Sequence, residues 1–158
     1  MRPMWTVELD DMTATQALGY ALGEVVDGPT RVSLVGDLGA GKTTFAQGVG
    51  SGLGLNSPIV SPTFILMAEH LDGRHPLLHG DAYRLKPGEA EAIGMDEVIE
   101  TWPGLVLIEW GDLIPDSFDC PHLTVRLSHV DSGRVATISA MGRCHTAIMD
   151  AWRRALGA

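Results

Sequence analysis

The chain has 158 residues, of which 45% are hydrophobic and 20% charged, and its formal net charge is -9. This length predicts one domain over residues 1–158, and the negative charge argues against a protein that grips a nucleic-acid backbone unaided, because such proteins carry a basic surface. The first residues form no signal-peptide stretch and no apolar run is long enough to cross a bilayer, so we expect a cytoplasmic protein without membrane contact. Cys120 and Cys144 lack metal-type spacing and are expected to be free thiols.

The first third of the chain alternates strand and helix patterns. Residues 5–9 alternate as a short strand, and a capping-box pattern follows, with Thr13 as the predicted N-cap and Gln16 reaching back. Apolar residues then recur at helical spacing. The apolar run 31–35 predicts a buried strand, and a second helix is expected to run from the glycine-rich segment after it toward Gly52.

The rest of the chain has the patterns of strands and hairpins with two more helices. Asp72-Gly73 is a strong hairpin signal, and the apolar run 105–108 is the most strand-like in the chain. The predicted elements are a strand over 64–71, its partner over 75–83, an acidic helix over 87–100 with an exposed face, the strand 105–108, a hairpin of 123–128 with 134–140, and a helix over 145–156. Early alternation followed by hairpins predicts a mixed sheet with helices packed on it.

One glycine-rich segment connects the second predicted strand to the helix after it. It reads Gly36-Asp37-Leu38-Gly39-Ala40-Gly41-Lys42-Thr43, the pattern of a Walker A loop in the strand–loop–helix context that this motif requires. Glycines allow the backbone to curl around a phosphate, and the helix N-terminus adds partial positive charge there. Lys42 is then expected to bridge the β- and γ-phosphates and act in catalysis, and the hydroxyl of Thr43 to coordinate Mg²⁺.

This loop predicts ATP and Mg²⁺ as ligands, and an α/β fold of the P-loop NTPase type in which helices flank a mixed β-sheet in a single domain. A GTPase is disfavoured because the NKxD-type guanine motif is missing; the only other lysine is Lys86. The residues expected to contact the nucleotide are Gly36, Asp37, Leu38, Gly39, Ala40, Gly41, Lys42, Thr43, Thr44, Thr63 and Trp110.

Two carboxylates stand at the ends of predicted strands. Asp81 could reach Mg²⁺ directly or through water, as a Walker-B-type residue does, or it could be a strand-end turn residue. Glu109 ends the apolar run 105–108, at the edge where a parallel sheet presents ligands. It could orient or deprotonate the attacking water and contribute to the metal site, or it could be a solvated strand-end charge.

Four further side chains are candidates with open alternatives. Thr63 lies in a proline-stiffened loop, where its hydroxyl could sense the γ-phosphate or form an ordinary turn. Trp110 could stack on a base or a partner, or pack as a structural residue. His79 shares a strand face with Asp81, and we expect a supporting role for it. Arg84 could pair with a phosphate or form a structural ion pair.

Four blocks, in order, resemble the TsaE (YjeE) family, whose members are the ATPases of bacterial tRNA threonylcarbamoyladenosine biosynthesis. They are the glycine loop continued to Phe45, the switch-like segment Val60-Ser61-Pro62-Thr63-Phe64, the segment His79-Gly80-Asp81-Ala82-Tyr83-Arg84-Leu85, and Ile108-Glu109-Trp110. The resemblance is clear from about Thr15 to Trp110 and looser beyond.

The resemblance implies an ATPase subunit that binds and hydrolyses Mg-ATP in complex with a TsaB–TsaD pair and so supports repeated turnover. It implies that tRNA is contacted only through these partners, in keeping with the negative charge. Two alternatives stay open. One is a small P-loop metabolite kinase, although no segment convincingly supplies an arginine-bearing lid. The other is a nucleotide-gated interaction module with negligible hydrolysis.

Overall fold

The computed structural model describes residues 2–37, 39–56, 59 and 67–157. These residues form a seven-stranded sheet with the strand order β1-β7-β6-β2-β5-β4-β3. Its strands are β1 (Met4–Leu9), β2 (Thr30–Gly36), β3 (Met67–His70), β4 (Leu77–Asp81), β5 (Leu105–Glu109), β6 (His122–Val130) and β7 (Gly133–Met141). The four central strands β6, β2, β5 and β4 are parallel to one another, and the β1–β7, β6–β7 and β3–β4 pairs are antiparallel. The predicted mixed sheet is confirmed.

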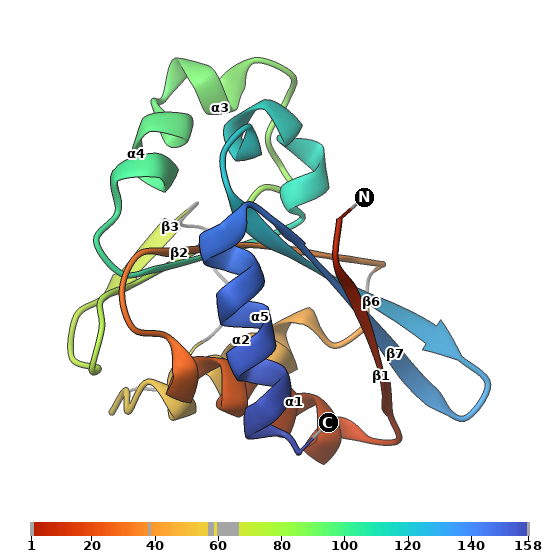
Figure 1. Ribbon diagram of the computed structural model, residues 1–158. Helices are drawn as coiled ribbons and strands as arrows, with labels where there is room; N and C mark the ends of the chain where they lie inside the picture. The colour runs from red at the N-terminus through yellow and green to blue at the C-terminus, as the bar shows by residue number, and fades with distance from the viewer. Residues whose placement is uncertain (1, 38, 57–58, 60–66, 158) are drawn as a thin grey trace.

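Helices cover both faces of this sheet (Figure 1). In the view of Figure 1, α1, α2 and α5 lie below the sheet, and α3 and α4 lie above it. The helices are α1 (Met12–Val25), α2 (Lys42–Gly52), α3 (Glu89–Ala92), α4 (Met95–Thr101) and α5 (Arg143–Ala155), with two short 3₁₀ helices, η1 (Gly111–Leu113) and η2 (Pro115–Phe118).

The two faces of the sheet carry separate apolar cores, as β5 illustrates. Leu105 and Leu107 belong to the core that includes Phe45 of α2, whereas Val106 and Ile108 belong to the core under α3 and α4. Successive side chains of a strand point to opposite faces, so a strand buried on both sides is a continuous apolar run. This explains why the run 105–108 was the clearest strand signal.

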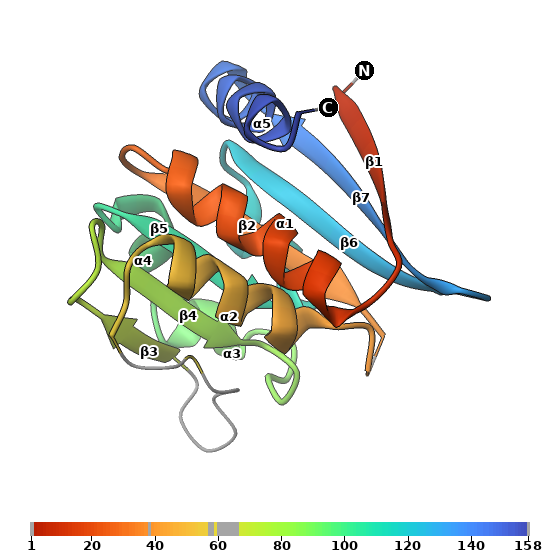
Figure 2. The ribbon, with the colours of Figure 1, turned by 90° about the horizontal axis from the view of Figure 1, so that it is seen from below.

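Glycines allow α1 and α2 to pack with their backbones in close contact. Gly23 of α1 faces Gly52 of α2, and a Cβ atom built on Gly48 of α2 would lie 2.2 Å from the carbonyl oxygen of Gln16. No side chain fits at such a distance. Figure 2, which is seen from below, shows the two helices side by side in front of the sheet. This contact brings the N-terminal end of α1 beside the loop that begins α2.

Two details of the sequence-based interpretation are wrong. The N-cap of α1 is Asp11 and not Thr13, because Asp11 has extended backbone angles and its Oδ1 accepts a hydrogen bond of 2.8 Å from the N–H of Ala14. The acidic segment 87–100 is not one helix. It forms two helices, α3 and α4. The helical conformation is interrupted between them at Gly94, whose φ of 74° is incompatible with a continuous helix.

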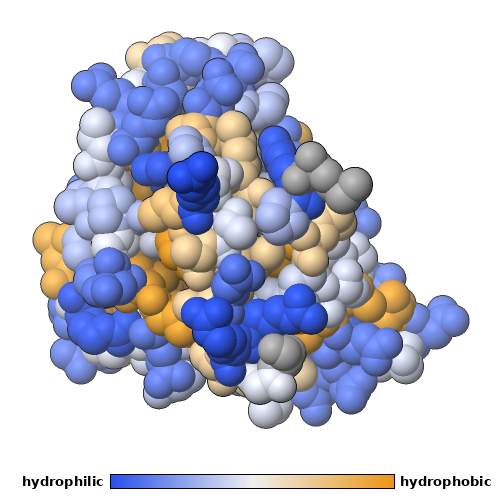
Figure 3. Space-filling view, in the orientation of Figure 1, coloured by the Kyte–Doolittle hydropathy of each residue, from blue (hydrophilic) through white to orange (hydrophobic). Residues whose placement is uncertain are grey.

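The surface agrees with several of the simpler expectations. Glu89, Glu91, Glu97 and Glu100 are exposed, and the end of the molecule that α3 and α4 form is hydrophilic in Figure 3. Cys120 and Cys144 are free cysteines, as predicted. In the part of the chain that the structure describes, no helix is both long enough and apolar enough to span a membrane.

Candidate functional site

The glycine loop joins the end of β2 to the start of α2. Gly39 (φ 76°) and Gly41 (φ 104°) have backbone conformations that side chains with a Cβ rarely adopt. Gly41 is the N-cap of α2 and offers no side chain to cap it. The first N–H groups of a helix need acceptors, so this end of α2 is suited to receive the oxygens of an anionic ligand. Leu38, a predicted contact, lies outside the described residues.

Lys42 lies inside this loop and is almost fully buried. Its Nζ donates hydrogen bonds to the carbonyl oxygens of Gly36 at 2.7 Å and Asp37 at 2.8 Å, and it lies 4.1 Å from the ring centroid of Trp110. Burial lowers the pKa of Lys42, while the negative charges of Glu109 and other nearby carboxylates act in the opposite direction. The loop backbone therefore holds the ammonium group inside the glycine loop.

The two predicted carboxylates meet at the carboxyl ends of neighbouring parallel strands. Asp81 of β4 and Glu109 of β5 are register partners. Glu109 Oε1 accepts a long hydrogen bond of 3.5 Å from Thr43 Oγ1, and Glu109 Oε2 lies 2.7 Å from His79 Nε2. Glu109 is only 3% exposed, so the alternative of a solvated strand-end charge is wrong.

Asp81 is less enclosed than Glu109. Its Oδ1 accepts a hydrogen bond of 2.9 Å from the N–H of Tyr83, as in a strand-end turn. Burial and the nearby charge of Glu109 raise the pKa of Asp81, against the effects of the Tyr83 hydrogen bond and of the Lys42 charge. The turn contact uses one carboxylate oxygen and agrees with the strand-end turn, whereas the Mg²⁺ role of Asp81 stays a prediction.

These groups line one cavity of about 320 Å³ on the strand side of the loop. Its lining consists of Gly39, Gly41, Lys42, Thr43, Thr44, Asp81, Tyr83, Glu109 and Trp110. Trp110 has a φ of 60°, the only positive φ among the described non-glycine residues, and its ring packs on Tyr83 with 4.8 Å between centroids. Such backbone strain outside glycine is concentrated at functional sites.

The described residues contain no group of three or more His, Cys, Asp or Glu side chains arranged to hold a metal ion. The cavity instead combines two carboxylates with the Thr43 hydroxyl. Mg²⁺ is commonly bound by one or two carboxylates together with ligand phosphates and water. The donor set therefore fits an ion that arrives with a phosphate ligand.

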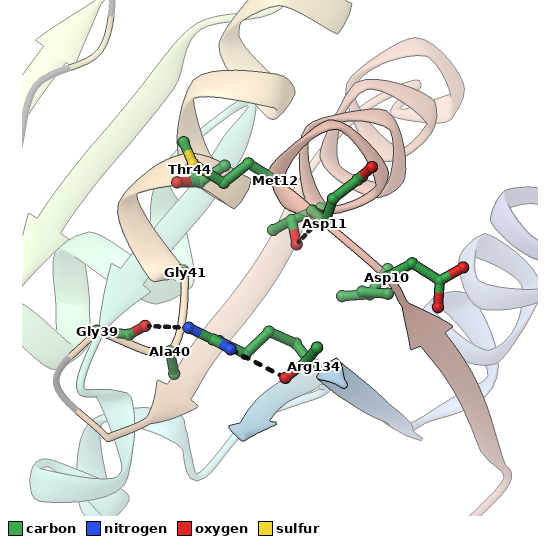
Figure 4. A pocket seen from close by; sticks show the side chains of 11 residues that line it. Asp10, Asp11, Met12, Gly39, Ala40, Gly41, Thr44 and Arg134 are labelled. Atoms are coloured by element: carbon green, nitrogen blue, oxygen red, sulfur yellow. Dashed lines mark hydrogen bonds between the residues drawn. The ribbon is translucent and has the colours of Figure 1, made fainter. Parts of the chain in front are cut away.

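A second cavity of about 310 Å³ lies on the helix side of the same loop (Figure 4). Its lining consists of Leu9, Asp10, Asp11, Met12, Thr15, Gly39, Ala40, Gly41, Thr44, Gly133 and Arg134. Arg134 extends toward the loop, and its Nη2 donates a hydrogen bond of 3.2 Å to the carbonyl oxygen of Gly39. Leu9 and Arg134 were not predicted to line this cavity, because they come from distant segments that only the β1–β7 pairing brings together.

Two other predicted contacts have different outcomes. Thr63 lies outside the described residues. Arg84 is exposed after the end of β4 and lines neither of these two cavities. The other predicted contacts that the structure describes lie in the glycine loop or line the cavity beside it.

A buried parallel strand, a glycine loop, a helix that begins at the loop lysine, and carboxylates on the neighbouring strand ends define a P-loop fold. Residues 9–136 match the model of a family described as "Threonylcarbamoyl adenosine biosynthesis protein TsaE". The chain belongs to this family, as the four sequence blocks predicted.

Individual relatives agree with this assignment. The chain is 44% identical over 133 residues to the tRNA threonylcarbamoyladenosine biosynthesis protein TsaE of Nostoc sp., which covers 82% of each chain. It is 40% identical over 112 residues to the TsaE protein of Bacillus subtilis, with 70% of each covered. The crystal structure of Bacillus subtilis YdiB superposes with a TM-score of 0.83 and 29% identity, covering 98% of this chain and 97% of that one.

Proposed function

We propose that this protein binds and hydrolyses Mg-ATP as the ATPase subunit of the bacterial machinery that makes tRNA threonylcarbamoyladenosine. The observation that carries the proposal is the convergence of Lys42, Thr43 and Glu109 in one cavity at the glycine loop. Membership of the TsaE family supports the role in tRNA modification.

The loop would hold the phosphates of ATP. Lys42 would exchange its two carbonyl acceptors for oxygens of the β- and γ-phosphates, since an ammonium group prefers charged acceptors. Thr43 and Asp81 would hold Mg²⁺, and Glu109 would contribute to the metal site through water. When bound, this ion would neutralise charge on the phosphate oxygens.

Glu109 is the proposed general base. Its carboxylate is buried and one of its oxygens lies toward Thr43, whereas the other is held by His79. In hydrolysis a water oxygen would attack the γ-phosphorus and its proton would pass to Glu109 while the bond to the β-phosphate oxygen breaks. Lys42 would stabilise the charge that develops on the phosphates.

The nucleoside of ATP would occupy the cavity on the helix side of the loop. Gly39, Gly41 and Thr44 line both cavities, so a ligand whose phosphates lie in the loop can extend into the second one. Asp10 and Asp11 offer acceptors for ribose hydroxyls or an exocyclic amine. Trp110 and Thr63 would complete the contacts at the phosphate end.

The proposed protein partner is a TsaB–TsaD pair, and tRNA would be contacted only through this pair. The proposed location of the complex is the cytoplasm. The net charge of -9 supports this division of labour, because an acidic domain is a poor ligand for a phosphate backbone. Docking would order the site and exclude water, so activity alone should be low.

Phosphate release from ATP, measured with and without TsaB–TsaD, tests the proposal. We expect slow release alone and faster release in the complex. Strong release alone that the partners leave unchanged would contradict the assembly role. Transfer of phosphate to a small metabolite would support a kinase, and binding without release would support an interaction module.

Calorimetry with Lys42→Ala tests the phosphate site. Charge-assisted hydrogen bonds contribute about 1.5–3 kcal/mol each, so ATP should bind roughly 10- to 150-fold more weakly per bond lost. Lys86→Ala is the matched control, because Lys86 is exposed and is the only other lysine. Unchanged ATP affinity in Lys42→Ala would place the phosphates elsewhere.

A further inference from the structure

His79 is a fully buried histidine next to the proposed catalytic machinery. It lies in β4 opposite Leu107 of β5, and Glu109 is two residues further along β5 on the same face. Its side chain is 0% exposed, and its Nε2 lies 2.7 Å from Glu109 Oε2. A polar ring in such a position needs a reason beyond packing.

Only one of the two ring nitrogens of His79, Nε2, has a hydrogen-bond partner among the described residues. Within the described part of the chain, His79 Nδ1 has no hydrogen-bond partner, so Glu109 alone orients the ring there. A carboxylate only accepts, and the tautomer with the proton on Nε2 is the neutral form that can donate to it. The contact is short and buried, which makes it a strong hydrogen bond.

The two oxygens of Glu109 therefore have different surroundings. Oε2 faces His79 in the interior, and Oε1 lies 3.5 Å from Thr43 Oγ1 at the cavity. Without a donor at Oε2, the carboxylate would be free to rotate. A competing partner is then the buried ammonium group of Lys42, since Glu109 is the carboxylate with the largest Coulombic effect on the pKa of Lys42.

We propose that His79 is a positioning residue, which holds Oε2 of Glu109 so that Oε1 stays directed at Thr43 and the reacting water. The inference rests on the proposed ATP hydrolysis for its catalytic consequence, and on geometry alone for the hydrogen bond itself. His79 does not touch the substrate and acts through Glu109.

Kinetics in the TsaB–TsaD complex test the catalytic consequence. Loss of a residue that orients a catalytic ligand typically costs about 10- to 100-fold in activity, so His79→Leu should lower kcat by that factor. The Kd for ATP should change less than about threefold, because the phosphate donors are untouched. His79→Gln, whose amide can donate near the position of Nε2, should recover most of the rate. His75→Leu, two residues before the start of β4, should leave kcat unchanged.

The double variant His79→Leu with Glu109→Gln separates positioning from a general loss of structure. If His79 acts only through Glu109, then His79→Leu should cause no further loss of kcat in the Glu109→Gln background. Losses that multiply, or a wild-type rate in His79→Leu, would overturn the inference.

Nuclear magnetic resonance of ¹⁵N-labelled histidine tests the hydrogen bond without any catalysis. We expect His79 to carry its proton on Nε2 in slow exchange with solvent, and Glu109→Ala to speed that exchange strongly. A proton on Nδ1 in the wild type, or exchange unaffected by Glu109→Ala, would overturn the inference even if the protein hydrolyses ATP. The absence of hydrolysis by the wild type would instead contradict the proposed function.

Discussion

The two sides of the glycine loop are built in different ways. On the strand side, the cavity is lined by charged and polar side chains from adjacent strand ends, among them Asp81 and Glu109. On the helix side, the lining comes from the start of α1, the loop backbone and the β6–β7 hairpin with Arg134. The first side holds the groups to which we assign the proposed chemistry, and the second holds groups suited to recognition. Motifs identified the first side, whereas the fold alone assembles the second.

The largest expected effect comes from a substitution on the strand side of the loop, and it is a fall in the rate of ATP hydrolysis. Glu109→Gln retains the shape and removes the charge, so ATP should still bind while kcat in the partner complex falls by about 10²–10⁴-fold. Phosphate release and calorimetry measure the two quantities. Asp81→Asn is the control, because it should also change the dependence on Mg²⁺. A near-normal rate in Glu109→Gln would move water activation to another carboxylate, with Asp37 the next candidate.

A buried histidine that lines neither cavity should make the free energy of unfolding depend on pH. His145 of α5 is fully buried, and its Nε2 accepts a hydrogen bond of 3.0 Å from the N–H of Arg31 at the start of β2. Burial, and then the charges of Arg31 and His122, lower its pKa to about 4, against about 6.5 in the unfolded chain. Between these values the unfolded state binds a proton that the folded state does not.

The free energy of unfolding should therefore fall as the pH drops from about 6.5 toward 4, by up to about 3 kcal/mol, and level off below. Urea unfolding at a series of pH values measures this. His145→Gln retains an acceptor and cannot titrate, so its profile should be flatter, with ATP affinity at neutral pH unchanged. An equally steep profile in His145→Gln would assign the acid sensitivity to other groups.

The glycine contact between α1 and α2 supports the helix side. In Gly48→Ala, the new Cβ would lie 2.2 Å from the carbonyl oxygen of Gln16, and overpacking of this kind typically costs about 1–3 kcal/mol of unfolding free energy. Ser51→Ala, which is exposed on the same helix, should stay within about 0.5 kcal/mol of the wild type. A more stable Gly48→Ala protein would mean that the two helices separate without cost.

The smallest expected effect comes from a substitution on the helix side of the loop, and it is a loss of affinity for ATP. Arg134→Leu removes the exposed hydrogen bond to Gly39. A hydrogen bond contributes about 0.5–1.5 kcal/mol, so the Kd for ATP should rise at most roughly 2- to 13-fold, with kcat little changed. Arg126→Leu, exposed on β6, is the matched control. If Arg134→Leu lowered kcat and not affinity, the division between the two sides would be wrong.

Local patterns predicted most of the elements, and the errors have physical causes. Asp11 and Thr13 are both good N-cap residues, and the preference between them depended on where β1 ends and the chain turns. The acidic run 87–100 has helical composition, but Gly94 adopts a φ of 74° as the chain passes from α3 to α4. Element types were therefore more predictable than element boundaries.

The sequence by itself determined the glycine loop, because its function depends on backbone freedom and on a lysine at a fixed spacing, which are local properties. Only the tertiary structure decided that Glu109 is buried against His79, since burial depends on the β4–β5 pairing and on the packing of α2. It likewise decided that Arg134 reaches Gly39, because a contact between distant segments arises from strand order. Neither contact can be predicted from the spacing of the residues along the chain.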